Sequence, residues 1–132
     1  MIRAIDSADQ FTIIGENIHT TRIVLRNGRR ATTLEDGTEA ITFKSSEGSA
    51  RHLTVPEHFK ETQAYEQGQL KHFMIAVWKG VHGDAEERAE GAAYIEYEAR
   101  RQIRAGAHFL DLNVDEVSHV VEEQKRSMRW LV

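Results

Sequence analysis

The chain has 132 residues, which is the length of one ordinary domain. Its 17 basic and 21 acidic residues give a net charge of −4, which argues against a general nucleic-acid binder because such proteins carry a basic excess. The absence of cysteine excludes disulfides, thiolate metal sites and a thiol nucleophile. No stretch approaches the roughly 18 apolar residues of a membrane helix, and the first residues are a poor secretory signal. We therefore expect a cytoplasmic protein with no membrane partner.

The first part of the chain is expected to contain one buried strand and then an antiparallel β-meander. Residues 11–16 form a short apolar run typical of a buried strand, and the polar residues 17–21 predict a loop. Residues 22–55 read as three or four short strands. The turn signals between them are Asn27-Gly28, which predicts that residues 21–25 pair with residues 30–34, and Asp36-Gly37.

The middle of the chain is expected to be helical. Residues 57–81 have a helical composition, with Pro56 opening the segment and Gly68 dividing it. A second helix is predicted to begin after Asp84, because Asp84 and Glu87 have the spacing of a capping box. It is predicted to end at Gly106. Its expected apolar stripe consists of Ala85, Ala89, Ala92, Ile95, Ala99 and Ile103.

The last part of the chain predicts a second buried strand and a final helix. The strand covers residues 108–114, and Asp115 is positioned to cap a helix from Glu116 onward. Its expected apolar face consists of Val117, Val120, Val121, Met128 and Leu131. Because this helix ends on apolar residues without a cap, we expect the chain to be truncated. Without the meander the order is β-α-β-α, which favours a parallel sheet with helices outside.

Two polar residues near the carboxyl end of the second strand are candidates for ligand binding. Side chains alternate along a strand, so Phe109, Asp111 and Asn113 share one face. Unpaired buried polar groups cost about 1–3 kcal/mol each, and in a barrel this end of a strand is where ligands bind. The alternative is that Asp111 caps local backbone amides and Asn113 begins the loop.

Two segments resemble the pterin-binding domain family. Residues 11–21, Phe-Thr-Ile-Ile-Gly-Glu-Asn-Ile-His-Thr-Thr, resemble the first strand of pterin-binding methyltransferases. Residues 105–116, Ala-Gly-Ala-His-Phe-Leu-Asp-Leu-Asn-Val-Asp-Glu, resemble their second strand, and the final Val-Asp-Glu looks like the folate domain of cobalamin-dependent methionine synthase. Residues 128–132 are similar to the following helix of corrinoid methyltransferases.

The resemblance implies a fold and a function. It implies that residues 1–132 are the amino-terminal part of an α/β fold, a (β/α)8 TIM-type barrel, with the meander inserted at residues 22–56. It implies methyl transfer from methyltetrahydrofolate to a corrinoid, with cobalamin carried by a partner protein or domain. The implied pterin-binding residues are Asp111, Asn113, Glu16, Asn17 and His19. No catalytic residue and no metal ligand is assigned.

The sequence departs from the family pattern at three places. Asn17 stands where the family has arginine, His19 stands where it has asparagine, and the meander stands where the first barrel helix should begin. Glu16 has an alternative structural role, and His19 an alternative place in a solvated loop. A dihydropteroate synthase-like enzyme and a non-catalytic binding or assembly module therefore remain alternatives. An incomplete barrel would also expose apolar faces and strand edges, so we expect self-association.

The remaining signals are interpreted as structural. The spacing of His52, His58, His72 and His82 matches no metal motif, so these side chains are expected at the surface. The cluster of Arg26, Arg29 and Arg30 is expected in a solvated turn, and Trp78 is expected in the core.

Overall fold

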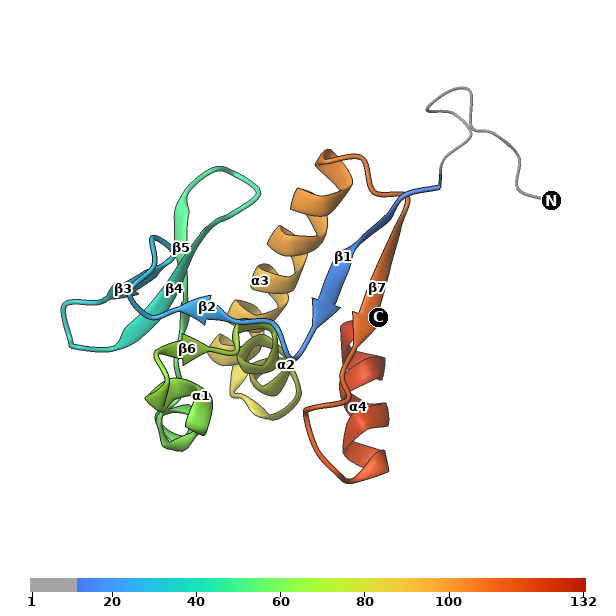
Figure 1. The fold of residues 1–132 in the computed structure, drawn as a ribbon. Coiled ribbons are helices and arrows are strands. Elements are labelled where there is room, and N and C mark those ends of the chain that lie inside the picture. Colours follow the sequence, from blue (N-terminus) through green and yellow to red (C-terminus); the bar gives the residue numbers. More distant parts are fainter. Residues whose placement is uncertain (1–11) are drawn as a thin grey trace.

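The computed structural model describes residues 12–132, which form a mixed α/β fold. The expectation of an α/β fold is confirmed at this level, and no closed barrel is formed by the described residues. The elements are β1 (Ile14–His19), β2 (Val24–Leu25), β3 (Ala31–Thr33), β4 (Glu39–Lys44), β5 (Ala50–Thr54), the 3₁₀ helix η2 (Glu57–Glu61), α1 (Gln63–Glu66), β6 (Gln69–Leu70), α2 (His72–His82), α3 (Ala85–Arg104), β7 (Phe109–Asn113) and α4 (Val121–Leu131). Helix α3 lies between the β3–β4–β5 meander and the β1–β7 pair (Figure 1).

The two strands β1 and β7 pair in parallel, as the order of the predicted elements indicated. Phe11, the first residue of the predicted strand, lies outside the described residues. The prediction of a loop from residue 17 was wrong, because β1 continues to His19. A register irregularity between Gly15 and Ile18 shifts the pairing, and it brings Ile18 into the core with only 2% exposure. Residues 17–19 therefore continue β1 despite their polar sequence, after a change of register.

Gly15 lies in close contact with side chains where β1 packs against α3. A Cβ placed on Gly15 would lie 2.6 Å from Oε1 of Gln102 and 3.0 Å from the side chains of Ala107 and Leu110. A side chain here would need Gln102 to move and Ala107 and Leu110 to shift slightly. The glycine of the Gly-Glu pair therefore lets the strand lie directly on the helix that precedes β7.

The meander is confirmed, but its first strand has a different partner. Strands β3, β4 and β5 form an antiparallel sheet, while β2 pairs with β6 rather than with β3. The hairpin predicted at Asn27-Gly28 was wrong, because the two-residue turn needs positive φ at both positions. Within the described chain, positive φ occurs at Gly37, Gly48, Gly68 and Gly106. Gly37 makes the second predicted turn, and Gly68 divides the helical segment as expected.

Helix α3 has the predicted ends but a different buried face. Asp84 and Glu87 form a capping box, and the chain leaves the helix through Gly106. The predicted apolar stripe was wrong as the inner face, since Ala85, Ala89, Ala92 and Ile103 are exposed and only Ile95 and Ala99 are half-buried. The buried residues of α3 are Gly91, Tyr94, Glu98 and Gln102. A Cβ on Gly91 would lie 2.5 Å from the Ala76 carbonyl oxygen, so α2 and α3 pack with their backbones close together.

Helix α4 begins five residues later than expected. The predicted start at Glu116 was wrong, because Asn113 and Asp115 form a turn and Val120 occupies the N-cap position. The predicted apolar face is also only partly buried, since Val120 and Val121 are each 58% exposed. Leu131 of the predicted face packs against the core, and Trp130, which was not predicted, packs on α2.

The core joins the meander to the helices. Phe43 packs edge-on against Tyr94 with ring centroids 5.2 Å apart, and Ile41 of β4 and Leu53 of β5 are fully buried on the meander. Trp78 is half-buried and contacts Phe59, so it lies at the edge of the core. Among residues 12–132, no helix combines the length and the apolar composition needed to cross a bilayer.

Candidate functional site

The carboxyl ends of β1 and β7 meet at one edge of the fold. His19 is the register partner of Asn113, and the backbone N–H of Thr20 donates to the Asn113 carbonyl at 3.1 Å. The arrows of β1 and β7 run in the same direction in Figure 1, so both strands end at the same edge. Of the five predicted site residues, the structure therefore brings His19 and Asn113 together at this edge, with Asp111 two residues further back on β7.

One face of the β1–β7 pair is covered by helices and the other is open. Leu110 and Leu112 pack against the core, as the alternation predicted, whereas Phe109 is 63% exposed and its partner Ile14 is 66% exposed. Asp111 lies on the open side and is exposed. It makes no hydrogen bond or ion pair with any described residue, so the expected alternative of local amide capping is not seen there.

The Asn113 side chain is held in a local turn. Its Oδ1 accepts from the backbone N–H of Asp115 at 2.9 Å, and its Nδ2 donates to the Asp115 carboxylate at 3.2 Å. These contacts correspond to the alternative in which Asn113 begins the loop. A ligand that uses this amide must therefore replace the bonds to Asp115.

The His19 ring is oriented by the residues that follow it. Its Nδ1 accepts from the backbone N–H of Thr21 at 3.1 Å and lies 2.6 Å from the Thr21 hydroxyl oxygen. A nitrogen that accepts from an N–H carries no proton, so in the neutral ring the proton is on Nε2. His19 thus presents a donor beside an open hollow of about 440 Å³ that is also lined by Thr21, Arg22 and Ile23.

Glu16 and Asn17 belong to β1, but their side chains lie outside the described part of the structure. Their assignment as pterin-binding residues stays a prediction.

An ion pair that the sequence did not indicate braces the loop after β7. Lys71, directly before α2, donates from Nζ to Glu116 at 2.6 Å. The two residues are 45 positions apart, and no local pattern links them. The pair fixes the loop that begins at Asn113 to the start of α2, beside the candidate site.

A buried polar network lies where α2 and α3 meet the meander. Arg30 donates to the Tyr94 hydroxyl and to Glu98, and the Tyr94 hydroxyl contacts Nδ1 of His72. Arg101 pairs with the other oxygen of Glu98 at 3.1 Å. The expectation that His72 lies at the surface was wrong, since its side chain is fully enclosed. Arg30 lies in a turn as expected, but its side chain is only 30% exposed because it joins this network.

The network keeps His72 neutral. Burial lowers the pKa of His72 from 6.5 to about 3, with further lowering by the positive charges of Arg30, Arg101 and Arg22. Burial and the nearby carboxylate of Glu98 raise the pKa of Tyr94. The Tyr94 hydroxyl accepts from Arg30 and is hydrogen-bonded to Nδ1 of His72 at 2.5 Å, with the donor in this second bond set by the His72 tautomer. The arrangement is a hydrogen-bonded network that ties the meander to α2 and α3.

No three histidine, aspartate or glutamate side chains in the described part of the chain are grouped so as to hold a metal ion.

Comparison with protein-family models, with curated proteins and with solved structures finds no match to this chain.

Proposed function

We propose that this chain binds a reduced pterin or folate at the carboxyl ends of β1 and β7. In this proposal β1 and β7 are adjacent strands of a (β/α)8 barrel, and their open face lines the barrel interior. The enzyme transfers the methyl group of methyltetrahydrofolate to a corrinoid that a partner protein or domain carries.

The observation that carries the proposal is the unpaired Asp111 carboxylate on the open face of a parallel strand pair. In parallel α/β folds, ligands bind beyond the carboxyl ends of the strands. The pterin edge carries a row of N–H donors beside acceptors, and a carboxylate can accept two such hydrogen bonds in one plane. Asp111 is free to do so because no described residue occupies its oxygens.

His19 supplies the complementary donor. Its Nε2–H points away from the Thr21 contacts, and its strand position is level with Asn113. A donor near the pterin ring can stabilise charge on the departing amine when the methyl group leaves, which is a form of general-acid assistance. The corrinoid supplies the acceptor for the methyl group when its carrier docks.

Titration calorimetry of the protein with 5-methyltetrahydrofolate tests this proposal. Asp111→Asn should abolish measurable binding, because the amide replaces one acceptor oxygen by a donor. Glu35→Gln is the matched control, since it removes one exposed carboxylate from a distant turn and should leave the affinity unchanged. Absence of binding by the wild-type protein, or equal binding by the Asp111 variant, contradicts the proposal. Condensation of a pterin with aminobenzoate would assign the synthase-like alternative instead.

A further inference from the structure

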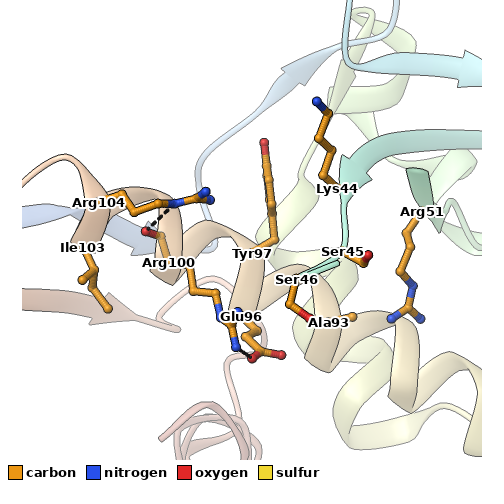
Figure 2. A pocket seen from close by; sticks show the side chains of 10 residues that line it. All are labelled: Lys44, Ser45, Ser46, Arg51, Ala93, Glu96, Tyr97, Arg100, Ile103 and Arg104. Atoms are coloured by element: carbon orange, nitrogen blue, oxygen red, sulfur yellow. Dashed lines mark hydrogen bonds and ion pairs between the residues drawn. The ribbon is translucent and has the colours of Figure 1, made fainter. Parts of the chain in front are cut away.

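A cationic groove lies between the β4–β5 turn and the last turns of α3. Its volume is about 360 Å³. Figure 2 shows the side chains that line it, with the Tyr97 ring standing between Arg104 and Lys44 in this view. The hairpin and the helix are thus two walls with positive groups on both.

The groove contains more cations than its own carboxylate can neutralise. Four basic residues line it, and Glu96 is the one acidic residue among the lining side chains. Glu96 is already paired with Arg100 in the next helical turn. This concentration of positive charge occurs although the whole chain has a net charge of −4.

Three of the cations have no carboxylate partner among residues 12–132. The Arg51 guanidinium lies 6.0 Å from the Phe43 ring centroid, and Nε of Arg104 donates to the Arg100 carbonyl at 3.4 Å. No hydrogen bond or ion pair engages the Lys44 ammonium within the described residues. Like charges gathered in a concave site repel one another and raise the local positive potential. A bound anion would relieve that repulsion.

Neutral donors accompany the cations. The hydroxyl groups of Ser46 and Tyr97 make no hydrogen bond to any described residue, whereas Ser45 is used to organise the turn through Ser49. Charged and neutral donors around one hollow are the recognition chemistry of multiply charged oxyanions. We propose that this groove binds a small molecule bearing two or more phosphate or carboxylate groups.

The groove is separate from the candidate pterin site. It adjoins the carboxyl-terminal turns of α3, which lead into the amino-terminal end of β7, whereas His19 and Asn113 lie at the opposite end of the strands. The two proposals therefore stand or fall independently.

Titration calorimetry in a phosphate-free buffer of low ionic strength tests the inference, with pyrophosphate and citrate as separate probes. At least one probe should bind saturably to the wild-type protein. Lys44→Glu and Arg104→Glu, on the two opposite walls, should each weaken binding about tenfold or more. Arg29→Glu is the matched control, because it makes the same change of charge at an exposed turn outside the groove and should leave the affinity unchanged. Circular dichroism establishes that each variant is folded.

The outcomes discriminate the inference from non-specific attraction. Tighter binding of pyrophosphate identifies phosphate groups as the preferred ligand chemistry, and tighter binding of citrate identifies carboxylates. Equal weakening by Arg29→Glu would show a diffuse charge effect and overturn the inference. Absence of saturable binding of both probes, or unchanged affinity in the two folded groove variants, would also overturn it.

Discussion

The indole ring of Trp130 lies directly against the backbone of Gly80, so closely that a Cβ on this glycine would fall 1.9 Å from two ring carbons. Trp130 belongs to α4 and Gly80 to α2, and this contact is where the last helix joins the rest of the fold. The absence of a side chain at Gly80 is therefore a packing requirement, although glycine weakens a helix.

Gly80→Ala should destabilise the protein by about 1–3 kcal/mol, because the new methyl group displaces the indole. Urea unfolding followed by circular dichroism measures the effect. In a Trp130→Ala background the same substitution should be neutral or stabilising by up to about 1 kcal/mol, since alanine is the better helix former. Equal destabilisation in both backgrounds would show that the glycine is needed for another reason.

The buried ion pair of Lys79 and Glu90 gives a second prediction. Lys79 is only 1% exposed and donates to Glu90 at 2.9 Å, and Glu90 also accepts from the backbone N–H of Thr54 at 3.0 Å. Glu90→Gln leaves the ammonium buried without a counter-charge and should cost about 3–5 kcal/mol of unfolding free energy. Chemical denaturation provides the measurement.

Two further variants serve as controls for Glu90→Gln. Glu96→Gln breaks an exposed pair with Arg100 and should change stability by less than about 0.5 kcal/mol. Combining Glu90→Gln with Lys79→Met removes both charges and keeps the acceptor for Thr54, so most of the lost stability should return. Failure of the double variant to recover would mean that the charges themselves are not the cause.

The buried histidine predicts how stability depends on pH. The pKa of His72 falls from 6.5 to about 3 on folding, so the unfolded chain binds the extra proton throughout this range. Above pH 6.5 the burial of neutral His72 carries no proton penalty. As the pH falls below 6.5, the free energy of unfolding decreases by up to about 1.4 kcal/mol per pH unit. Denaturation measured between pH 6.5 and 5 should show this slope.

His72→Gln should flatten the slope between pH 6.5 and 5, because glutamine does not titrate. His119→Gln is the control, since His119 is exposed and its replacement should leave the slope as in the wild type. The carboxyl groups with lowered pKa values, such as Glu39 and Glu123, titrate below this window. A steep slope that survives His72→Gln would contradict the assignment.

The open face of β1 and β7 predicts self-association. Ile14 and Phe109 are register partners, and both are mostly exposed. Phe109→Lys should lower the tendency to associate, measured by sedimentation over a range of protein concentrations, without lowering the unfolding midpoint. Val132→Lys changes another exposed apolar residue, which is 90% exposed and belongs to neither β1 nor β7, and should have no effect. A wild-type protein that stays monomeric at all concentrations would contradict the expectation.

The sequence predicted helix ends and turns correctly where these features depend on residues close together in the chain. The capping box of Asp84 and Glu87, the turn at Gly37 and the stop at Gly106 each depend on residues within a few positions, and all three were predicted. The alternation of Leu110 and Asp111 likewise follows from strand geometry alone. These features placed the strand that carries the candidate site.

The buried face of α3 and the ion pair at the candidate site depend on contacts between residues far apart in the sequence, so the sequence did not predict them. The alanines of α3 looked like its inner face, but the helix turns Tyr94 and Glu98 inward because Arg30 and His72 satisfy their polar atoms. Similarly, no local pattern pairs Lys71 with Glu116 at the edge of the candidate site. Such contacts join residues that are distant in the chain, so they become visible only in the folded structure.

The network of Arg30, Tyr94 and His72 has a consequence for how the meander behaves. It spans the boundary between the meander and the helices, and Arg30 also donates to Glu98 of α3. Separating the two parts would break these hydrogen bonds and expose the apolar core that the meander shares with the helices. A proteolytic cut in the exposed turn at Gly48 should therefore leave two peptides that migrate as one particle and unfold in a single cooperative step.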